Sequence, residues 1–276
     1  MNLYSITITC AAGLERHLKS ELESLCPERS FNEQLGRITM DVDLREVYRV
    51  LTWSRVGSRV LLNLASVAVD DDQGMYDAVA SVPWTEHFGP EHTFAVDFKG
   101  RASWLRNSQY GAFRVKDAIV DVFRDATGQR PNVDTETPSI RLFARLNKGR
   151  IDIGIDLSGP LHRRGYREGG GLAPIRETLA AALLMQLRWP ELAKDGQSFY
   201  DPMCGTGTFV IEAAMMATDM APGLLRASLG CEQWYGHSDV IAKEVLDEAK
   251  ERFSNGQRSY LGTIVGSEVS NKALQA

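Results

Sequence analysis

The sequence lacks any apolar run approaching the roughly 18 to 20 residues of a membrane-spanning helix. Its first ten residues alternate as a strand does and lack the basic and apolar regions of a secretory signal peptide. We therefore expect no membrane partner. With 276 residues, 43% of them hydrophobic and 24% charged, the composition is that of a globular protein of two or three domains.

Cysteine is scarce, and the few cysteines are widely spaced. They form no CxxC pair and stand at Cys10, Cys26, Cys204 and Cys231. This pattern indicates neither a zinc site nor a disulfide framework. We therefore expect no metal, and a reducing cytoplasm is the location that the cysteines favour.

Basic residues are outnumbered by acidic ones, 31 against 36, so the net charge is −5. The basic residues are nevertheless unevenly distributed. Residues 97–176 hold 15 Lys and Arg against 9 Asp and Glu, a local charge of +6. A basic middle between acidic flanks is compatible with one surface that faces RNA. Ordinary solvated surface charge would produce the same asymmetry, so charge alone leaves both interpretations open.

Hydrophobic periodicity predicts alternating strands and helices in the first half of the chain. We expect strands at 2–9, 36–42, 58–69 and 93–98, helices at 13–25, 43–53, 75–82 and 108–126, and a hairpin at 139–157. Asp43 is the expected N-cap of its helix. Phe113 is expected on the apolar face of the last helix, and Asn147 and Gly149 in the hairpin turn. This order predicts a small α+β layer of ferredoxin-like style.

The second half begins with a segment typical of a linker or a functional loop, because residues 158–174 contain five Gly and two Pro. Helices are then expected at 175–188, 208–217 and 239–254, and strands at 198–201 and 261–266. This order matches the first half of a doubly wound sheet. Only two parallel strands fit, so we expect the chain to end within the fold and residues 159–276 to be less stable than 1–156.

The strongest local motif is D-P-M-C-G-T-G-T, residues 201–208, between an expected strand and an expected helix. Gly205 and Gly207 permit a tight turn and close backbone approach by a ligand, and the free N–H groups of the helix start suit an anionic group. Val210 stands where a nicotinamide-binding fingerprint has its third glycine, which disfavours a dehydrogenase. No lysine follows the glycines, so a P-loop is also disfavoured.

An acid follows the last expected strand, in V-G-S-E at residues 265–268. An acid in that position can accept the ribose hydroxyls of an adenosine. Glu268 lies 63 residues beyond Gly205, whereas the usual offset is about 20. The spacing alone favours an ordinary surface acid, although an insertion at 218–237 and the following helix would absorb the excess.

Three segments carry a resemblance to a known family. The motif at 201–208 resembles the nucleotide-binding motif of class I S-adenosylmethionine methyltransferases, in the form used by amino-methylases of RNA and DNA. A-P-I-R-E-T-L-A-A-A-L-L, residues 173–184, looks like their motif X helix. A-A-M-M-A-T-D-M-A-P-G-L-L-R, residues 213–226, is similar to an insertion in the bacterial large-subunit rRNA guanine-N2 methyltransferases, a group that includes a bifunctional form.

The resemblance implies an α+β N-terminal region, ferredoxin-like plus THUMP, followed by an incomplete α/β doubly wound Rossmann-like methyltransferase domain. The implied boundaries are a ferredoxin-like piece at 1–42, an RNA-holding THUMP domain at 43–156 and the methyltransferase part at 157–276. F-A-V-D-F-K-G at 94–100 is similar to a THUMP strand. The implied cofactor is S-adenosyl-L-methionine, and the implied partner is structured RNA, 23S rRNA or a large-subunit precursor.

The resemblance also implies residue roles. We expect the cofactor to contact Asp201, Cys204, Gly205, Gly207, Thr208, Glu268 and, from motif X, Thr178. The glycine turn would meet its methionine portion and Glu268 its ribose. We expect RNA phosphates to meet Lys99, Arg101, Arg106, Lys116, Arg163, Arg164 and Arg167.

One departure from the family pattern concerns catalysis. These enzymes carry an [N/D]-P-P-[F/Y/W] motif, and this sequence contains no Pro-Pro. We expect that motif beyond Ala276, so no catalytic residue is assigned and the chain alone is expected to be inactive. Ser270 also stands where the family often has a further acid. The alternatives are a non-catalytic RNA-binding piece and a related THUMP-containing tRNA guanine-N2 methyltransferase.

Overall fold

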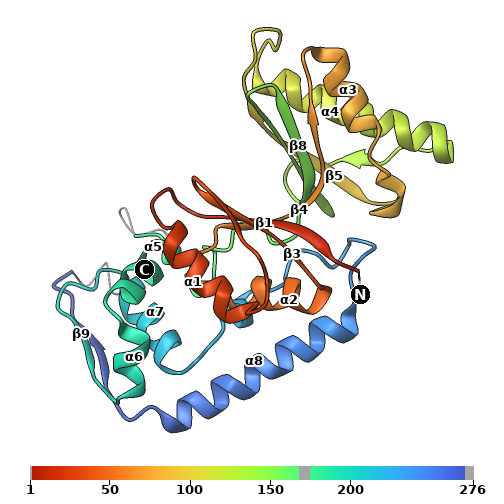
Figure 1. Ribbon diagram of the computed structural model, residues 1–276. Helices are drawn as coiled ribbons and strands as arrows, with labels where there is room; N and C mark the ends of the chain where they lie inside the picture. The colour runs from red at the N-terminus through yellow and green to blue at the C-terminus, as the bar shows by residue number, and fades with distance from the viewer. Residues whose placement is uncertain (1, 168–174, 271–276) are drawn as a thin grey trace.

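The computed structural model describes residues 2–167 and 175–270, which form an eight-stranded sheet, a two-stranded sheet and their helices (Figure 1). The first module contains β1 (Tyr4–Thr9), α1 (Glu15–Leu25), β2 (Asn32–Gln34), β3 (Arg37–Val42), α2 (Leu44–Trp53) and β4 (Arg59–Ala68). The second contains α3 (Asp72–Ala80), the 3-10 helix η1 (Trp84–Glu86), β5 (Thr93–Gly100), α4 (Ser108–Thr127), β6 (Asn132–Val133), β7 (Ile140–Asn147) and β8 (Arg150–Asp156). The third contains α5 (Glu177–Gln186), α6 (Trp189–Lys194), β9 (Phe199–Asp201), α7 (Thr208–Ala217), the 3-10 helix η2 (Pro222–Leu225), α8 (Asp239–Ser259) and β10 (Ile264–Gly266).

The first module forms where the periodicity predicts it. In β1, Ile6 and Ile8 are fully buried, and α1 buries Leu18 and Leu22 in the same hydrophobic cluster. The predicted cap of α2 is confirmed: the Asp43 carboxylate accepts a hydrogen bond from the Glu46 N–H at 2.9 Å. The Glu46 carboxylate accepts one from the Asp43 N–H at 2.8 Å, which completes a capping box.

The first two modules share one sheet. Its strand order is β2-β3-β1-β4-β8-β7-β5-β6, and the antiparallel β4–β8 pair joins the two halves. β5 runs parallel to both of its neighbours, β6 and β7. Because side chains alternate along a strand, Ser5, Thr7 and Thr9 of β1 face away from the core and line an open groove on the other side of the sheet.

Two details of the second module differ from the sequence prediction. Phe113 of α4 is 54% exposed and does not face the core, whereas Ile119 and Phe123 of the same helix are fully buried. The hairpin turn places Lys148 and Gly149, at φ +49° and +70°, in the left-handed region. Asn147 instead ends β7, so the turn begins one residue later than expected.

The third module has the predicted strand–turn–helix order. Its two strands pair in parallel, with Tyr200 opposite Val265, and α5 packs against α7. α8 runs along α2, as Figure 1 shows, and Arg49 of α2 forms an ion pair with Glu248 of α8 at 3.3 Å. Within 2–167 and 175–270, no helix combines the length and apolar character that crossing a membrane would require.

Candidate functional site

The carboxyl ends of β9 and β10 hold a turn between them. The N–H of Ser267 donates to the Asp201 carbonyl at 2.9 Å, and the N–H of Cys204 donates to the Ser267 carbonyl at 3.0 Å. The Asp201 carboxylate accepts a hydrogen bond from the Met203 N–H at 3.0 Å. Asp201 therefore fixes the start of the turn with its side chain and ties it to β10 with its backbone.

The two glycines give this turn an open inner side. Gly205 and Gly207 have φ values of +55° and +80°, a region that favours glycine. A Cβ on Gly205 would meet no heavy atom within 4 Å, so space lies beside the backbone there. Gly207 is the N-cap of α7, and no side chain caps the helix, so its first N–H groups remain available to an anionic ligand.

Glu268 contacts the turn, although it lies 63 residues beyond Gly205 in the sequence. Its Oε2 atom accepts a hydrogen bond from the Gly205 N–H at 3.0 Å, and its Oε1 atom accepts one from the Ser270 N–H at 3.0 Å. These backbone donors lower the pKa of Glu268, the Ser270 contact most, so the carboxylate is ionised near neutral pH. Each carboxylate oxygen can accept more than one hydrogen bond, so capacity for ribose hydroxyls remains.

Gly266, which was not among the predicted site residues, allows β10 to lie this close to the turn. A Cβ on Gly266 would lie 2.8 Å from Cγ2 of Val210 and 2.9 Å from Cβ of Cys204, too close for any larger residue. Burial, with Asp201 next in effect, raises the pKa of the Cys204 thiol, so the thiol stays neutral. The glycine directly before Ser267 in V-G-S-E was the signal available in the sequence.

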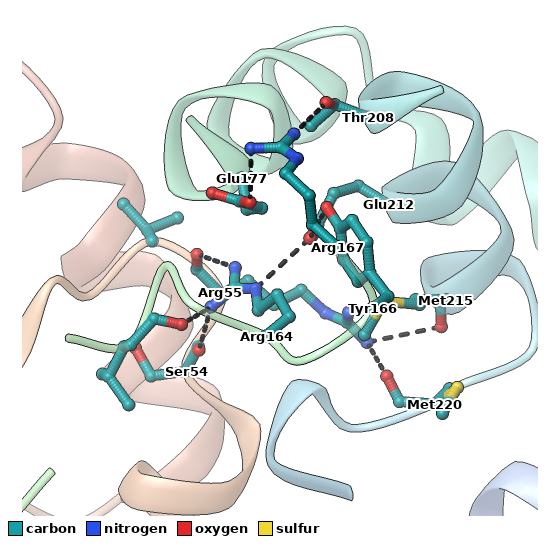
Figure 2. A network of polar contacts seen from close by, with 12 residues as sticks. Ser54, Arg55, Arg164, Tyr166, Arg167, Glu177, Thr208, Glu212, Met215 and Met220 are labelled. Carbon is teal, nitrogen blue, oxygen red and sulfur yellow. Dashed lines mark hydrogen bonds and ion pairs between the residues drawn. The ribbon is translucent and has the colours of Figure 1, made fainter. Parts of the chain in front are cut away.

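The loop before α5 reaches the same helix start. Arg167 forms an ion pair with Glu177 of α5 at 2.9 Å and donates a hydrogen bond to the Thr208 hydroxyl at 2.6 Å (Figure 2). Arg167 thus lies at the turn with its charge paired, and it is not the free cation on an RNA-facing surface that the sequence predicted. Thr208 and Thr178 are both buried in this region. The first two residues of the motif X segment, 173 and 174, lie outside the described residues.

The residues around the turn suit an adenosine linked to an amino acid. The inner side of Gly205 is open, α7 presents uncapped N–H groups, and an ionised acid stands at the end of the second strand. The structure brings Glu268 to the distant segment 201–208, which holds Asp201, Cys204, Gly205, Gly207 and Thr208. Thr178 belongs to the neighbouring α5, which packs against α7.

A second candidate site is the groove on the uncovered face of the large sheet. It has a volume of about 1630 Å³ and is lined by both the first and the second module. Its lining includes six cationic side chains: Arg37, Arg59, Lys99, Arg101, Arg145 and Lys148. Arg37 and Arg59 form ion pairs with Asp152 and Asp156. The other four are exposed, and within the described part of the chain none of them forms an ion pair, which leaves their charge available to phosphate.

The remaining RNA candidates are scattered. Arg106 is exposed in a hollow beside the groove, with its guanidinium 5.7 Å from the centre of the Tyr110 ring. Lys116 forms an ion pair with its neighbour Asp117, and Arg163 is exposed. Arg164 does not fit the prediction, because only 1% of its surface is accessible and its charge pairs with a buried acid.

Sequence reasoning also missed two residues of the groove, Arg145 and Lys148. Arg145 lies directly opposite Lys99 in the parallel β5–β7 pair. The alternation of R-L-F-A-R-L-N in 141–147 indicated a strand with one exposed face, but it did not indicate which strand lies beside it. Non-local pairing was therefore the missing information.

Comparisons with known proteins find relatives for all three modules. Sequence models of three families match: the RlmL ferredoxin-like domain at residues 5–61, the THUMP domain at 69–156 and the RMKL-like methyltransferase domain at 164–276. Two relatives are named ribosomal RNA large subunit methyltransferase K/L. The one from Hydrogenovibrio crunogenus is 41% identical over 96% of this chain and 36% of its own length. The one from Ectopseudomonas mendocina is 43% identical over 99% of this chain and 38% of its own length.

Solved structures resemble the whole chain. A protein described as a candidate methyltransferase and solved in complex with SAH has a TM-score of 0.86 and 25% identity, and the match covers 100% of this chain and 71% of that one. A protein from Listeria monocytogenes, named as a predicted N6-adenine-specific DNA methylase, has a TM-score of 0.85 and 27% identity, with 100% and 70% coverage.

The chain spans a little over a third of the length of the two curated relatives. The predicted fold class is confirmed, since a mixed α/β region is followed by a methyltransferase-like fold. The chain therefore consists of an RlmL ferredoxin-like domain, a THUMP domain and a region of the RMKL-like methyltransferase domain.

Proposed function

We propose that this chain supplies the cofactor site and the RNA-binding surface of an S-adenosylmethionine-dependent methyltransferase that acts on the exocyclic N2 of a guanine in large-subunit rRNA. The observation that carries the proposal is the ionised Glu268 carboxylate, which meets the Gly205 N–H at the open turn. The names of the relatives support rRNA as the substrate, and the solved neighbour with SAH supports the cofactor.

S-adenosylmethionine, when bound, supplies a methyl group that is activated by a positively charged sulfur. The residues of this chain would bind and orient it. Glu268 would accept hydrogen bonds from the ribose hydroxyls, and Gly205 and Gly207 would let the backbone approach the methionine portion. Orientation is then the main contribution to rate, because an activated electrophile needs little acid–base chemistry.

The groove would hold the RNA. Lys99, Arg101, Arg145 and Lys148 line the groove near the carboxyl ends of β5 and β7. They would contact phosphates, which position an RNA without reading its sequence. Arg106, Lys116 and Arg163 would extend that surface. The target guanine must leave its stack, which costs on the order of a few kcal/mol, and backbone contacts offset this cost.

The domain boundaries and the catalytic motif also belong to the proposal. We propose that the THUMP part ends near 156 and that the methyltransferase part follows. The expected end of the ferredoxin-like part near residue 42 lies inside the family match at 5–61 and inside the first module, which continues through β4. The motif with two prolines that presents the base is absent from the 276 residues. We propose that the full-length protein supplies it and that the 276-residue chain alone does not transfer methyl groups.

The reaction is tested with the full-length protein, radiolabelled S-adenosylmethionine and unmodified 23S rRNA. The expected product, identified by mass spectrometry of the nucleosides, is N2-methylguanosine. In a parallel assay with tRNA, incorporation of label into tRNA but not into rRNA would favour the related tRNA enzyme. N6-methyladenosine as the product would contradict the guanine assignment. Binding of RNA without binding of SAH would favour the non-catalytic alternative.

The RNA surface is tested by replacing two opposite cations of the groove, Lys99→Gln together with Arg145→Gln. Affinity for rRNA should fall, and the slope of log K against log salt should become shallower by roughly 1.4 to 1.8, since each of the two phosphate contacts contributes roughly 0.7 to 0.9. Lys250→Gln, on the exposed side of α8, is the matched control and should change neither quantity. An unchanged slope in the double variant would remove the groove from the proposal.

A further inference from the structure

A buried ion pair lies next to the turn at residues 201–208, called the cofactor turn below, and has no role in the function proposed so far. The Arg164 Nε atom lies 3.2 Å from Oε1 of Glu212, and the two side chains are 1% and 0% exposed. Glu212 belongs to α7, one helical turn after Thr208, where the helix leaves the glycine turn. The pair therefore holds the helix that builds the cofactor site.

Arg164 connects that helix to the first module. Its Nη2 atom donates to the Arg55 carbonyl at 2.5 Å, and its Nη1 atom donates to the Leu161 carbonyl at 2.9 Å. Arg55 in turn donates to the Met220 carbonyl at 2.8 Å, just beyond the end of α7 (Figure 2). Two arginine side chains thus join the loop after α2 to helix α7. Arg164 contacts both of them, and Arg55 of the loop reaches the end of the helix.

The loop before α5, which carries Arg164, contacts α7 at two more points. The Tyr166 hydroxyl donates to Oε1 of Glu212 at 3.2 Å, and Arg167 donates to the Thr208 hydroxyl. Burial, and then the nearby Glu212 charge, raises the pKa of Tyr166 far above its usual range, so this hydroxyl stays a donor. Residues 164–167 therefore fix both the first and the second turn of α7.

Stability alone does not account for this arrangement. Burying two charges costs free energy that their attraction often fails to offset, and apolar residues of similar volume are commonly as stable or more so. The Oε2 atom of Glu212 is buried and has no hydrogen-bond partner among the described residues, which adds to the cost. What an apolar contact would not provide is direction, because Arg164 meets three segments through defined hydrogen bonds.

We propose that Arg164 and Glu212 are positioning residues that couple the RNA-holding part of the chain to the cofactor turn. α7 presents the turn correctly only while Arg164 holds it against the loop after α2. RNA bound to the first two modules would steady that loop and so strengthen cofactor binding, and the cofactor would strengthen RNA binding by the same factor. This inference rests on the proposed function.

The test uses the full-length protein and compares Glu212→Gln, the double variant Arg164→Met with Glu212→Leu, and Arg49→Gln. Arg49 is the matched control, because its ion pair with Glu248 also joins the first module to the third but does not touch α7. SAH affinity is measured by calorimetry with and without an rRNA fragment, RNA affinity without SAH is measured separately, and folding is followed by circular dichroism.

Glu212→Gln should weaken SAH binding at least about tenfold, abolish the gain in SAH affinity on adding RNA and leave RNA affinity alone unchanged. The double variant should keep or raise the melting temperature yet show the same SAH defect, which separates positioning from stability. Arg49→Gln should behave as the wild type. Glu212→Gln keeps the shape of the side chain, so its result decides the matter even if the double variant does not fold.

Two results would overturn the coupling while leaving the cofactor site in place. One is wild-type SAH affinity and an unchanged RNA effect in Glu212→Gln. The other is an equal defect in Arg49→Gln, which would show that loosening the module contact anywhere has the same effect. A folded wild-type protein that takes up no SAH would overturn the proposed function together with the coupling.

Discussion

Glu268 is the residue on which the cofactor site depends most directly. In Glu268→Gln, the amide presents one acceptor instead of two and cannot carry the charge that strengthens hydrogen bonds from ribose hydroxyls. We expect SAH affinity to fall by about tenfold to a hundredfold, the equivalent of one or two charge-assisted hydrogen bonds. Calorimetric titration measures this, with Glu251→Gln on the exposed side of α8 as the control.

The ionisation of Glu268 also sets a pH dependence. Its pKa is lowered in the folded protein, chiefly by the Ser270 N–H and then by the Gly205 N–H. A lowered pKa means that the favourable interaction is present above the ordinary Glu value and is lost as pH falls through the folded value. SAH affinity should therefore be flat from about pH 8 to pH 5 and decline only below about pH 4.5. A midpoint near pH 6 would assign the dependence to another group.

Gly205 offers a test of the open space beside the turn. An alanine at φ +55° costs about 1 kcal/mol of backbone strain, and its methyl group would enter the space proposed for the cofactor. Gly128, the C-cap of α4, is the matched control, since it has φ +72° and equally open surroundings. Both Gly205→Ala and Gly128→Ala should lower the melting temperature similarly, and only Gly205→Ala should lose SAH binding. Equal SAH affinity in the two variants would place the cofactor elsewhere.

At the scale of elements, α2 depends on its cap. Asp43→Ala removes the acceptor for the Glu46 N–H, so the free energy of unfolding should fall by about 1 kcal/mol. Asp43→Asn keeps an acceptor, so its free energy of unfolding should fall by only about a few tenths of a kcal/mol. Chemical denaturation compares the two variants, and an alanine variant as stable as the asparagine variant would show that the capping box contributes little.

Elements with a strong local signal could be predicted from the sequence. Helix α1, with its buried Leu18 and Leu22, and the cap of α2 each depend on residues of one short segment. Phe113 shows the limit, because α4 is amphipathic but its neighbours decide how far the buried face extends. Pairing of β5 with β7 depends on contacts between distant segments, which no local pattern encodes.

The candidate site shows the same division. The strand–turn–helix around Gly205 followed from adjacent residues. The contact of Glu268 with that turn spans 63 residues, and spacing alone argued against it. Arg164 failed as an RNA contact because a basic loop in the sequence gives no sign of which cation is buried by a partner on a distant helix.

At the scale of the whole molecule, apolar exposure is uneven. Tyr200 and Val265, which lie opposite each other in β9 and β10, are both exposed, whereas Ile6 and Val60 of the large sheet are fully buried. A two-stranded sheet with an exposed apolar face has few contacts to hold it closed. This uneven exposure supports the expectation that residues 159–276 are less stable than 1–156.

Hydrogen exchange tests that expectation strand by strand. In the 276-residue chain, amides of β9 and β10 should exchange by local opening, well before those of β1 and β4, which should exchange only on global unfolding. Limited proteolysis should likewise cut the third module first. Equal protection in both sheets would show that α8 and its contacts with α2 stabilise the third module as strongly as the large sheet stabilises the first two.

The central claim, that the turn at 201–208 and Glu268 hold S-adenosylmethionine, is tested most directly by calorimetric titration of SAH into the folded full-length protein. We predict one site per chain, weakened in Glu268→Gln, lost in Gly205→Ala and retained in Gly128→Ala. A folded wild-type protein that takes up no SAH, or a Gly205→Ala variant that binds it as tightly as the wild type, would contradict the claim.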